Sequence, residues 1–208
     1  MTPQTVEALI TANENLWHDA THHPFLNQIQ RGTLASEAFA TWLVQDYHFA
    51  SHLLASQSLM LSHAPRTDQA LLIGGLVALE SELTWFETNA KARNLDLTQP
   101  LLPTCRAYVD FLLALPRQPY VTQITSLWAA ERAYLDGWTT TLPCHATYRE
   151  FSERWTTPAF HEYVGGLEAA ANRALADASD NQRETTQAYF RWMAIYERDF
   201  WQMAFAGG

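Results

Sequence analysis

The feature that most constrains this chain is the spacing of its apolar residues, which recur every three or four positions along nearly the whole length. That spacing puts apolar side chains on one face of an α-helix. We find no stretch of alternating apolar and polar residues typical of a β-strand, and no internal repeat. The pattern predicts an all-α protein, a multi-helix bundle that folds as one domain over residues 1–208.

Capping residues and prolines divide the pattern into roughly eight helices. Thr157 followed by Pro158 is a typical helix start, and Ser179 with Gln182 resembles a capping box. A loop is expected around His22–Phe25 and again around Arg31–Thr33. The predicted helices span residues 6–17, 36–62, 67–93, 104–115, 119–140, 146–154, 158–178 and 179–205.

The charge balance excludes several classes of partner. The net charge is −9, and Lys91 is the single lysine among 13 basic residues. Since no basic run exists, we expect neither nucleic acid nor an anionic membrane surface as a partner. The chain has no long apolar segment and no basic, apolar leader at its start, so we expect no membrane span and a cytoplasmic location.

Acidic residues within apolar helical stretches are the best candidates for chemistry. All but Glu80 have an aromatic residue three or four positions away, hence on the same helix face. Burying a carboxylate is costly unless it is paired or protonated, so several that met in one pocket would act as a tuned acid and base. The alternative is that most lie on the surface or pair with a neighbouring arginine. These candidates are Asp46, Glu80, Glu82, Glu131 and Glu197.

Metal binding has less support. The pairs His18/His22 and His48/His52 have the four-residue spacing that can hold a metal on a helix. A di-iron bundle needs Glu-x-x-His on two helices, and no glutamate here has a histidine three residues later. We therefore expect no metal site.

The two cysteines provide no recognisable nucleophile. Cys105 lies near a predicted helix start, a position that can lower a thiol pKa, and Cys144 follows Pro143 in a loop. Neither has a histidine beside it in a catalytic motif, so we expect both to be buried or incidental cysteines. Gly-x-Ser-x-Gly, Walker A and dinucleotide-binding motifs are also missing from the sequence.

Three segments together resemble one known family. Residues 17–34 read W-H-D-A-T-H-H-P-F-L-N-Q-I-Q-R-G-T-L, residues 39–49 read F-A-T-W-L-V-Q-D-Y-H-F, and residues 196–204 read Y-E-R-D-F-W-Q-M-A. The combination resembles the TenA/thiaminase II family over about residues 5–206. That resemblance implies the helical fold that the family shares with haem oxygenase.

The resemblance is to the branch of the family that lacks the catalytic cysteine. The thiaminase-type branch carries that cysteine on a mid-chain helix, where this sequence reads L-W-A-A-E-R-A-Y with Glu131 in its place. Phe49 stands where the cysteine branch has a tyrosine, and E-L-T-W-F-E from Glu82 to Glu87 also looks like the Glu-bearing branch, TenA-E.

The resemblance implies an enzyme of thiamin pyrimidine salvage. Its substrates would be 4-amino-5-aminomethyl-2-methylpyrimidine, its N-formyl derivative, or both, hydrolysed by deamination or deformylation without a metal or organic cofactor. Homo-oligomers are common in this family, and we expect one. Two alternatives stay open: a thiaminase II that uses Cys105 or Cys144, and a pyrimidine-binding regulatory protein without activity. A metal-dependent oxidase of the same helical fold is a weaker third.

The same resemblance implies roles for particular residues. Glu197 matches the family's catalytic carboxylate and would act as general acid, and Glu131 would act as general base. A carboxylate such as Asp46 can hold the aminopyrimidine edge with two hydrogen bonds. The remaining expected substrate-binding residues are Tyr47, Phe49, Glu82, Tyr108, Tyr134 and Trp155.

Overall fold

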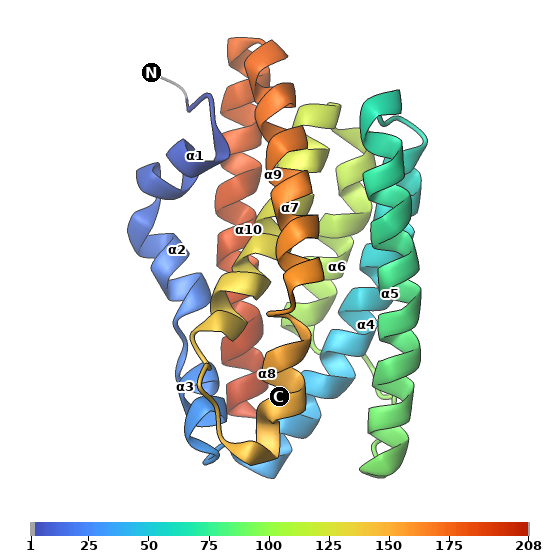
Figure 1. The fold of residues 1–208 in the computed structure, drawn as a ribbon, viewed down its shortest axis with the longest axis vertical. Helices are drawn as coiled ribbons and strands as arrows, with labels where there is room; N and C mark the ends of the chain where they lie inside the picture. The colour runs from blue at the N-terminus through green and yellow to red at the C-terminus, as the bar shows by residue number, and fades with distance from the viewer. Residues whose placement is uncertain (1–2, 208) are drawn as a thin grey trace. The chain divides into compact units, whose positions relative to one another are not determined.

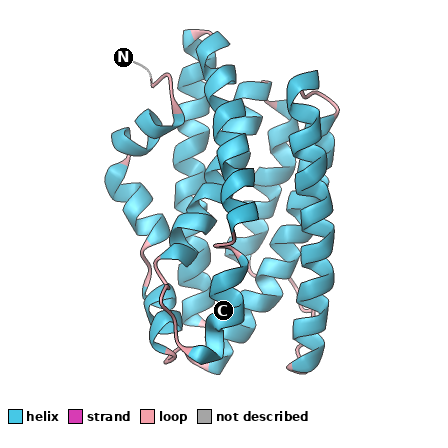
Figure 2. Cartoon of the chain, in the orientation of Figure 1, coloured by secondary structure: helices cyan, strands magenta, loops and turns pink. Residues whose placement is uncertain are grey.

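The chain is helical over most of residues 3–207, which are the residues that the computed structural model describes (Figure 1). Figure 2 shows only helix and loop over these residues, so the all-α prediction is confirmed. Two short 3₁₀ turns lie at Leu115–Arg117 and Ala146–Tyr148. The α-helices are α1 (Val6–Ala12), α2 (Glu14–Thr21), α3 (Pro24–Arg31), α4 (Ser36–Leu61), α5 (Arg66–Ala92), α6 (Pro103–Ala114), α7 (Tyr120–Thr139), α8 (Arg149–Arg154), α9 (Pro158–Asp177) and α10 (Asp180–Ala206).

The capping signals at the last two helices are confirmed. Thr157 Oγ1 accepts a hydrogen bond from the Phe160 amide at 3.2 Å at the start of α9. At α10, the Gln182 amide donates to Ser179 Oγ at 3.3 Å, and the Ser179 amide donates to Gln182 Oε1 at 2.9 Å. This reciprocal pair is a capping box, and it satisfies amides that the first helical turn leaves without partners.

The first predicted helix is two helices. Asn13 separates α1 from α2 because its backbone leaves the helical region, with φ −132° and ψ 33°. Its side-chain Nδ2 donates to the Leu9 carbonyl at 2.8 Å. Asparagine amides compete with the backbone for helical carbonyls in this way, which the apolar spacing alone does not reveal.

The helix α3 connects the two loops predicted at His22–Phe25 and Arg31–Thr33, and it includes residues of both. His23 caps its start, because His23 Nδ1 accepts a hydrogen bond from the Phe25 amide at 3.1 Å, and Pro24 occupies the first turn. Gly32 ends the helix in the left-handed conformation, with φ 72°. The H-P-F and R-G-T segments, expected to form loops, are therefore the two caps of one short helix.

The helices form two compact units, which we describe separately. One unit comprises the chain up to Leu34 together with Pro119–Gln202, and the other comprises Ala35–Gln118 together with the residues from Met203 onward. In the first unit, α7 packs against α9 and α2 (Figure 1), and Trp17 stacks on Phe190 at 5.3 Å within the core.

In the second unit, α4 packs against α5 and α6 (Figure 1). The residues of α4 from Trp42 to Asp46 are all buried. The Trp42 ring contacts Phe86 of α5 with centroids 6.1 Å apart. Across residues 3–207, every helix is too short or too polar to cross a lipid bilayer.

Candidate active site

Asp46 is a buried carboxylate on α4, with 3% of its surface exposed. Phe49, one turn further along, packs its ring against Tyr108 of α6 at 4.8 Å between centroids. Asp46 and Phe49 share one face of α4 because they are three residues apart. The structure therefore groups three of the predicted substrate-binding residues, Asp46, Phe49 and Tyr108, along the packing of α4 with α6.

Tyr47 lies on the neighbouring face of α4, toward α5. Its hydroxyl donates to Glu87 Oε1 at 3.3 Å. Partial burial and then the negative charge of Glu87 raise the pKa of the Tyr47 hydroxyl above its usual value. Because of this raised pKa, Tyr47 remains a protonated hydrogen-bond donor at neutral pH. Glu82, another predicted substrate-binding residue, is half-buried on α5.

An aromatic cluster lies in the first unit, where α7 meets α10 and the end of α8. Tyr134 stacks on Trp201 at 5.6 Å and makes an edge contact with Trp155 at 5.1 Å. Trp138 stacks on Trp155 at 5.0 Å. We call Tyr134, Trp138, Trp155 and Trp201 the aromatic cluster. Sequence reasoning selected Tyr134 and Trp155 but missed Trp138 and Trp201.

Contacts along α7 and α10 show that the two helices run parallel. Thr122 hydrogen-bonds Thr186 at 2.9 Å, and the Trp128 ring contacts Phe190 at 6.3 Å. Further along, the Trp138 ring contacts Trp201 at 6.0 Å. Residue numbers rise together on the two helices, with a nearly constant offset between partners.

This register relates the two predicted catalytic glutamates. By the same offset, Glu197 lies level with Tyr134, and Glu131 lies three residues earlier on α7, about 4.5 Å along the helix axis. Glu197 is four residues before Trp201 and Glu131 three before Tyr134, so each shares a helix face with a member of the aromatic cluster. Glu197 is buried, with 4% of its surface exposed, whereas Glu131 is half-buried.

The position of Cys105 near the start of α6 does not activate its thiol, in agreement with the expectation of a buried or incidental cysteine. The thiol is fully buried, and its Sγ donates to the Gln45 carbonyl at 3.5 Å. Burial, and secondarily the negative charge of Asp46, raises the pKa of the Cys105 thiol to about 12. Because the thiolate is the nucleophilic form, Cys105 is poorly suited to covalent catalysis.

The histidine pairs make other contacts. The His18 and His22 rings stack in parallel at 4.3 Å on the surface. His48 Nε2 donates to the Gln99 carbonyl at 2.8 Å, and His52 Nδ1 donates to the His48 carbonyl at 2.7 Å. Among residues 3–207 no three histidine, cysteine or carboxylate side chains gather closely enough to hold a metal ion.

A cavity of about 310 Å³ lies beside α4 in the second unit. The Gln45 side chain lines this cavity together with Pro100 and Leu102. Its Nε2 donates to the Pro100 carbonyl at 3.2 Å, and its Oε1 accepts from the Leu102 amide at 2.9 Å. None of the predicted site residues lines this cavity, and Asp46 follows Gln45 on a different helix face. Its lining residues are Glu37, Ala40, Thr41, Val44, Gln45, Gln99, Pro100, Leu102 and Gly207.

Comparison with known proteins identifies relatives over nearly the whole chain. Residues 11–206 match the sequence model of the TENA/THI-4/PQQC family. A "Probable bifunctional TENA-E protein" from Glycine max is 28% identical over 95% of this chain and 92% of its own length.

Solved structures of similar fold agree with this match. A TenA homologue from Pyrococcus furiosus superposes with a TM-score of 0.91 at 28% identity, covering 95% of this chain and 98% of the homologue. A TenA homologue from P. horikoshii OT3 superposes with a TM-score of 0.87 at 22% identity, covering 97% and 98% of the two chains. The latter likeness concerns the fold alone.

Proposed function

The chain belongs to the TENA/THI-4/PQQC family, and from this we propose that it is a hydrolase of thiamin metabolism that acts on aminopyrimidines. The substrates are 4-amino-5-aminomethyl-2-methylpyrimidine and its N-formyl derivative. The match to a relative named TENA-E supports the Glu-bearing branch, as does Glu131 at the position where the other branch carries its cysteine.

The observation that carries the proposal is the stacking of Tyr134 on Trp201 at 5.6 Å. These rings come from the two helices that bear Glu131 and Glu197, and each glutamate precedes its ring by about one turn on the same face. Aromatic rings offer stacking surfaces for a flat heterocycle. Glu197 is a buried carboxylate on the same face of α10 as Trp201.

In the proposed mechanism each residue has a distinct role. Asp46 binds the edge formed by the pyrimidine amino group and its neighbouring ring nitrogen. Glu131 accepts a proton from water, whose oxygen forms a C–O bond with the exocyclic methylene carbon. Glu197 supplies a proton as the C–N bond breaks, so ammonia leaves and the hydroxymethyl pyrimidine remains. For the N-formyl substrate the same water adds to the formyl carbon, and formate and the free amine are released.

In this proposal the family resemblance assigns substrate-binding roles to the aromatic residues Tyr134 and Trp155 of the first unit and Phe49 and Tyr108 of the second. It assigns polar contacts to Tyr47 and Glu82. The aromatic contacts of Tyr108 with Phe49 and of Tyr134 with Trp155 support these roles, because each side chain is held by a neighbouring ring. Side chains held in this way bind a flat ligand with little further loss of conformational freedom.

The test is to incubate the purified protein with the aminomethyl pyrimidine, the formylamino pyrimidine and thiamin in turn, and to identify products by mass spectrometry. We expect hydroxymethyl pyrimidine and ammonia from the first, and formate from the second. Binding of both pyrimidines without turnover would instead indicate a binding protein. Cleavage of thiamin that is lost in a Cys105→Ser/Cys144→Ser variant would indicate a thiaminase.

Glu197→Gln is expected to lower kcat by a hundredfold or more while the fold persists, since general acid–base groups contribute about 10²–10⁴ in rate. Glu184→Gln, the same substitution at an exposed position of α10, is the matched control and should leave kcat unchanged. Circular dichroism verifies folding of both variants. Near-normal turnover by folded Glu197→Gln would remove Glu197 from the mechanism.

A further inference from the structure

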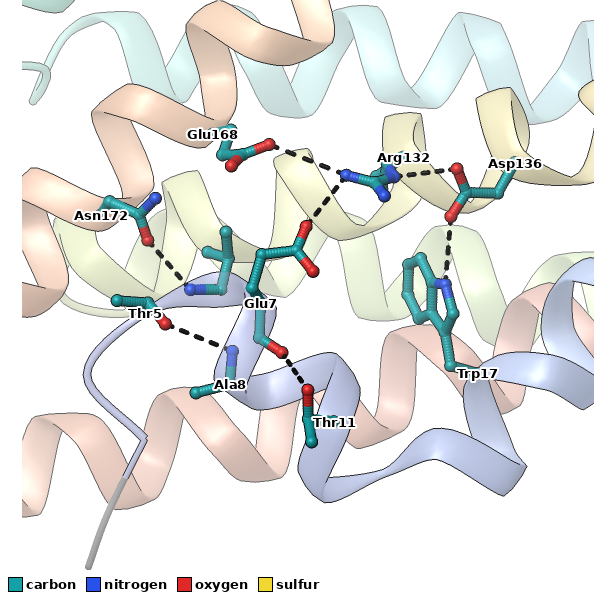
Figure 3. Close-up of polar contacts among 10 residues, drawn as sticks. Thr5, Glu7, Ala8, Thr11, Trp17, Arg132, Asp136, Glu168 and Asn172 are labelled. Atoms are coloured by element: carbon teal, nitrogen blue, oxygen red, sulfur yellow. Dashed lines mark hydrogen bonds and ion pairs between the residues drawn. The ribbon is translucent and has the colours of Figure 1, made fainter.

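Arg132, the residue after Glu131, is bound by acidic side chains from three helices (Figure 3). Its Nε donates to Asp136 Oδ1 at 2.8 Å within α7, and its Nη1 donates to Glu7 Oε1 of α1 at 3.3 Å. Glu168 Oε2 of α9 lies 3.7 Å from the same nitrogen. Asp136 also accepts a hydrogen bond from Trp17 Nε1 of α2 at 3.1 Å. We call these five residues the Arg132 network.

The Arg132 network is partly shielded from water. Only 26% of the Arg132 side chain is exposed, and Asp136 and Glu168 are similarly covered, whereas 56% of the Glu7 side chain is exposed. Burial lowers the pKa of Arg132, but the charge and hydrogen bond of Asp136, followed by the charges of Glu7 and Glu168, raise it to a net value above the usual one. The planar guanidinium can donate to several carboxylates at once, which a lysine cannot do in the same geometry.

The network acts on a different face of α7 from the aromatic cluster. Glu131, Tyr134 and Trp138 recur at intervals of three and four residues and share one face. Arg132 lies about 100° around the helix from Glu131, and Asp136 lies about 140° from it. The Arg132 network joins α7 to α1, α2 and α9 on this second face, and it therefore resists rotation of α7 about its own axis.

Such rotation matters for a carboxylate far from the helix axis. The Cα radius of an α-helix is about 2.3 Å, and a glutamate side chain extends the lever arm to roughly 6 Å. A 10° rotation then moves the carboxylate by about 1 Å. A displacement of that size can lower a reaction rate by as much as about a hundredfold.

We propose that Arg132 is a positioning residue that holds the Glu131 carboxylate in place by fixing the rotation of α7. The proposal rests on the catalytic role of Glu131 in the proposed function. Arg132 itself touches neither substrate nor reacting atoms. Its effect should therefore fall on the step that Glu131 performs and depend on the presence of the Glu131 carboxylate.

The test is a double-mutant cycle on the aminopyrimidine reaction with Arg132→Met, Glu131→Gln and the combined variant. We expect Arg132→Met to lower kcat by roughly ten- to a hundredfold with KM changed less than about threefold, because substrate binding is retained. In the Glu131→Gln background, Arg132→Met should change kcat by less than about twofold, since no carboxylate remains to be positioned.

Three further variants keep the result interpretable. Arg132→Lys retains the charge but not the planar fork, and should give a kcat between those of wild type and Arg132→Met. Glu7→Gln removes the contact of Arg132 with α1 and leaves the sequence of α7 unchanged. It should lower kcat with KM unchanged. This variant provides the test if Arg132→Met does not fold. Arg106→Met removes an exposed Arg–Asp pair of α6 with the same four-residue spacing, and it should leave kcat unchanged.

The outcomes separate the two proposals. If Glu131→Gln retains full activity, the catalytic role of Glu131 is refuted. If Glu131→Gln is impaired but folded Arg132→Met and Glu7→Gln retain wild-type kcat, the positioning role of Arg132 is refuted. Equal losses from Arg132→Met in both backgrounds would also refute it, because they would show an effect independent of Glu131.

Discussion

Replacing Gly32 with alanine is expected to destabilise the protein by about 2–5 kcal/mol. Gly32 ends α3 with φ 72° and ψ 25°, a left-handed conformation that costs an L-residue about 1–2 kcal/mol. A Cβ at this position would also overlap the ring of His145. The backbone cost and the overlap with His145 both destabilise the folded protein, and both arise from the methyl group that alanine adds.

His145 cannot move away without losing its own contacts. Its amide donates to the Gln30 carbonyl at 2.9 Å, and its Nδ1 accepts from the Thr147 amide at 3.3 Å. Inserting a methyl group into such a packed site typically costs about 1–3 kcal/mol. Added to the backbone term, this gives the predicted range, which corresponds to a fall in Tm of roughly 4–20 °C for a chain of this size.

Urea denaturation followed by circular dichroism measures the change. Gly74→Ala is the matched control, since a Cβ at Gly74 meets no atom within 4 Å in the part of the chain that the structure describes. It should stabilise α5 by about 0.5–1 kcal/mol. In a cycle with His145→Ala, the Gly32→Ala cost should fall by about 1 kcal/mol or more. A Gly32→Ala cost below 1 kcal/mol, or one unaffected by His145→Ala, would refute this reasoning.

Two further predictions concern titrating groups. Burial raises the pKa of the Cys105 thiol from about 9 to about 12 in the folded protein. Between these pH values the thiol ionises more readily in the unfolded chain. The free energy of unfolding should therefore fall as pH rises from about 9 to 12, by at most about 1.4 kcal/mol per pH unit. Unfolding of Cys105→Ala should lack this component, and an unchanged pH dependence would contradict the assignment. Burial lowers the pKa of His23 even though its hydrogen bond to Gln202 raises it. The unfolded chain therefore binds a proton at His23 more readily than the folded protein does. The contribution of neutral His23 to the free energy of unfolding is present above pH 6.5 and is lost as the pH falls further. His23→Asn keeps a capping side chain, and its Tm should depend less on pH between 7 and 5; equal dependence would show that His23 does not cause it.

Local signals predicted much of the fold. The start of α9 at Thr157-Pro158 and the capping box at Ser179 depend on residues within one turn of each other, so they can be identified before any packing is known. The break at Asn13 and the helix α3 were missed because a side-chain amide and a histidine cap compete with the apolar pattern. His23 is an uncommon cap, and its neutral Nδ1 accepts the Phe25 amide only in one tautomer.

The candidate site was less predictable. Glu131 and Glu197 were candidates because they lie in apolar helical stretches, and the family resemblance implied their roles. The partners of Tyr134 emerged only from packing. Trp138 and Trp201 could have been suspected because Trp138 is four residues after Tyr134 and Trp201 four after Glu197. The sequence indicated that Cys105 is a buried or incidental cysteine, and its burial is confirmed. Its position near a helix start favours a thiolate, but complete burial next to Asp46 favours the thiol more strongly.

The amino-acid sequence by itself determined the helical class, most helix boundaries and the family of this protein, because these depend on short-range spacing and on motifs. Only the tertiary structure decided that Arg132 binds Glu7 and Glu168, that Tyr134 stacks on Trp201, and that Cys105 is shielded from water. Such contacts join residues far apart in the chain, and their strength depends on the solvent and charges that packing places around each group.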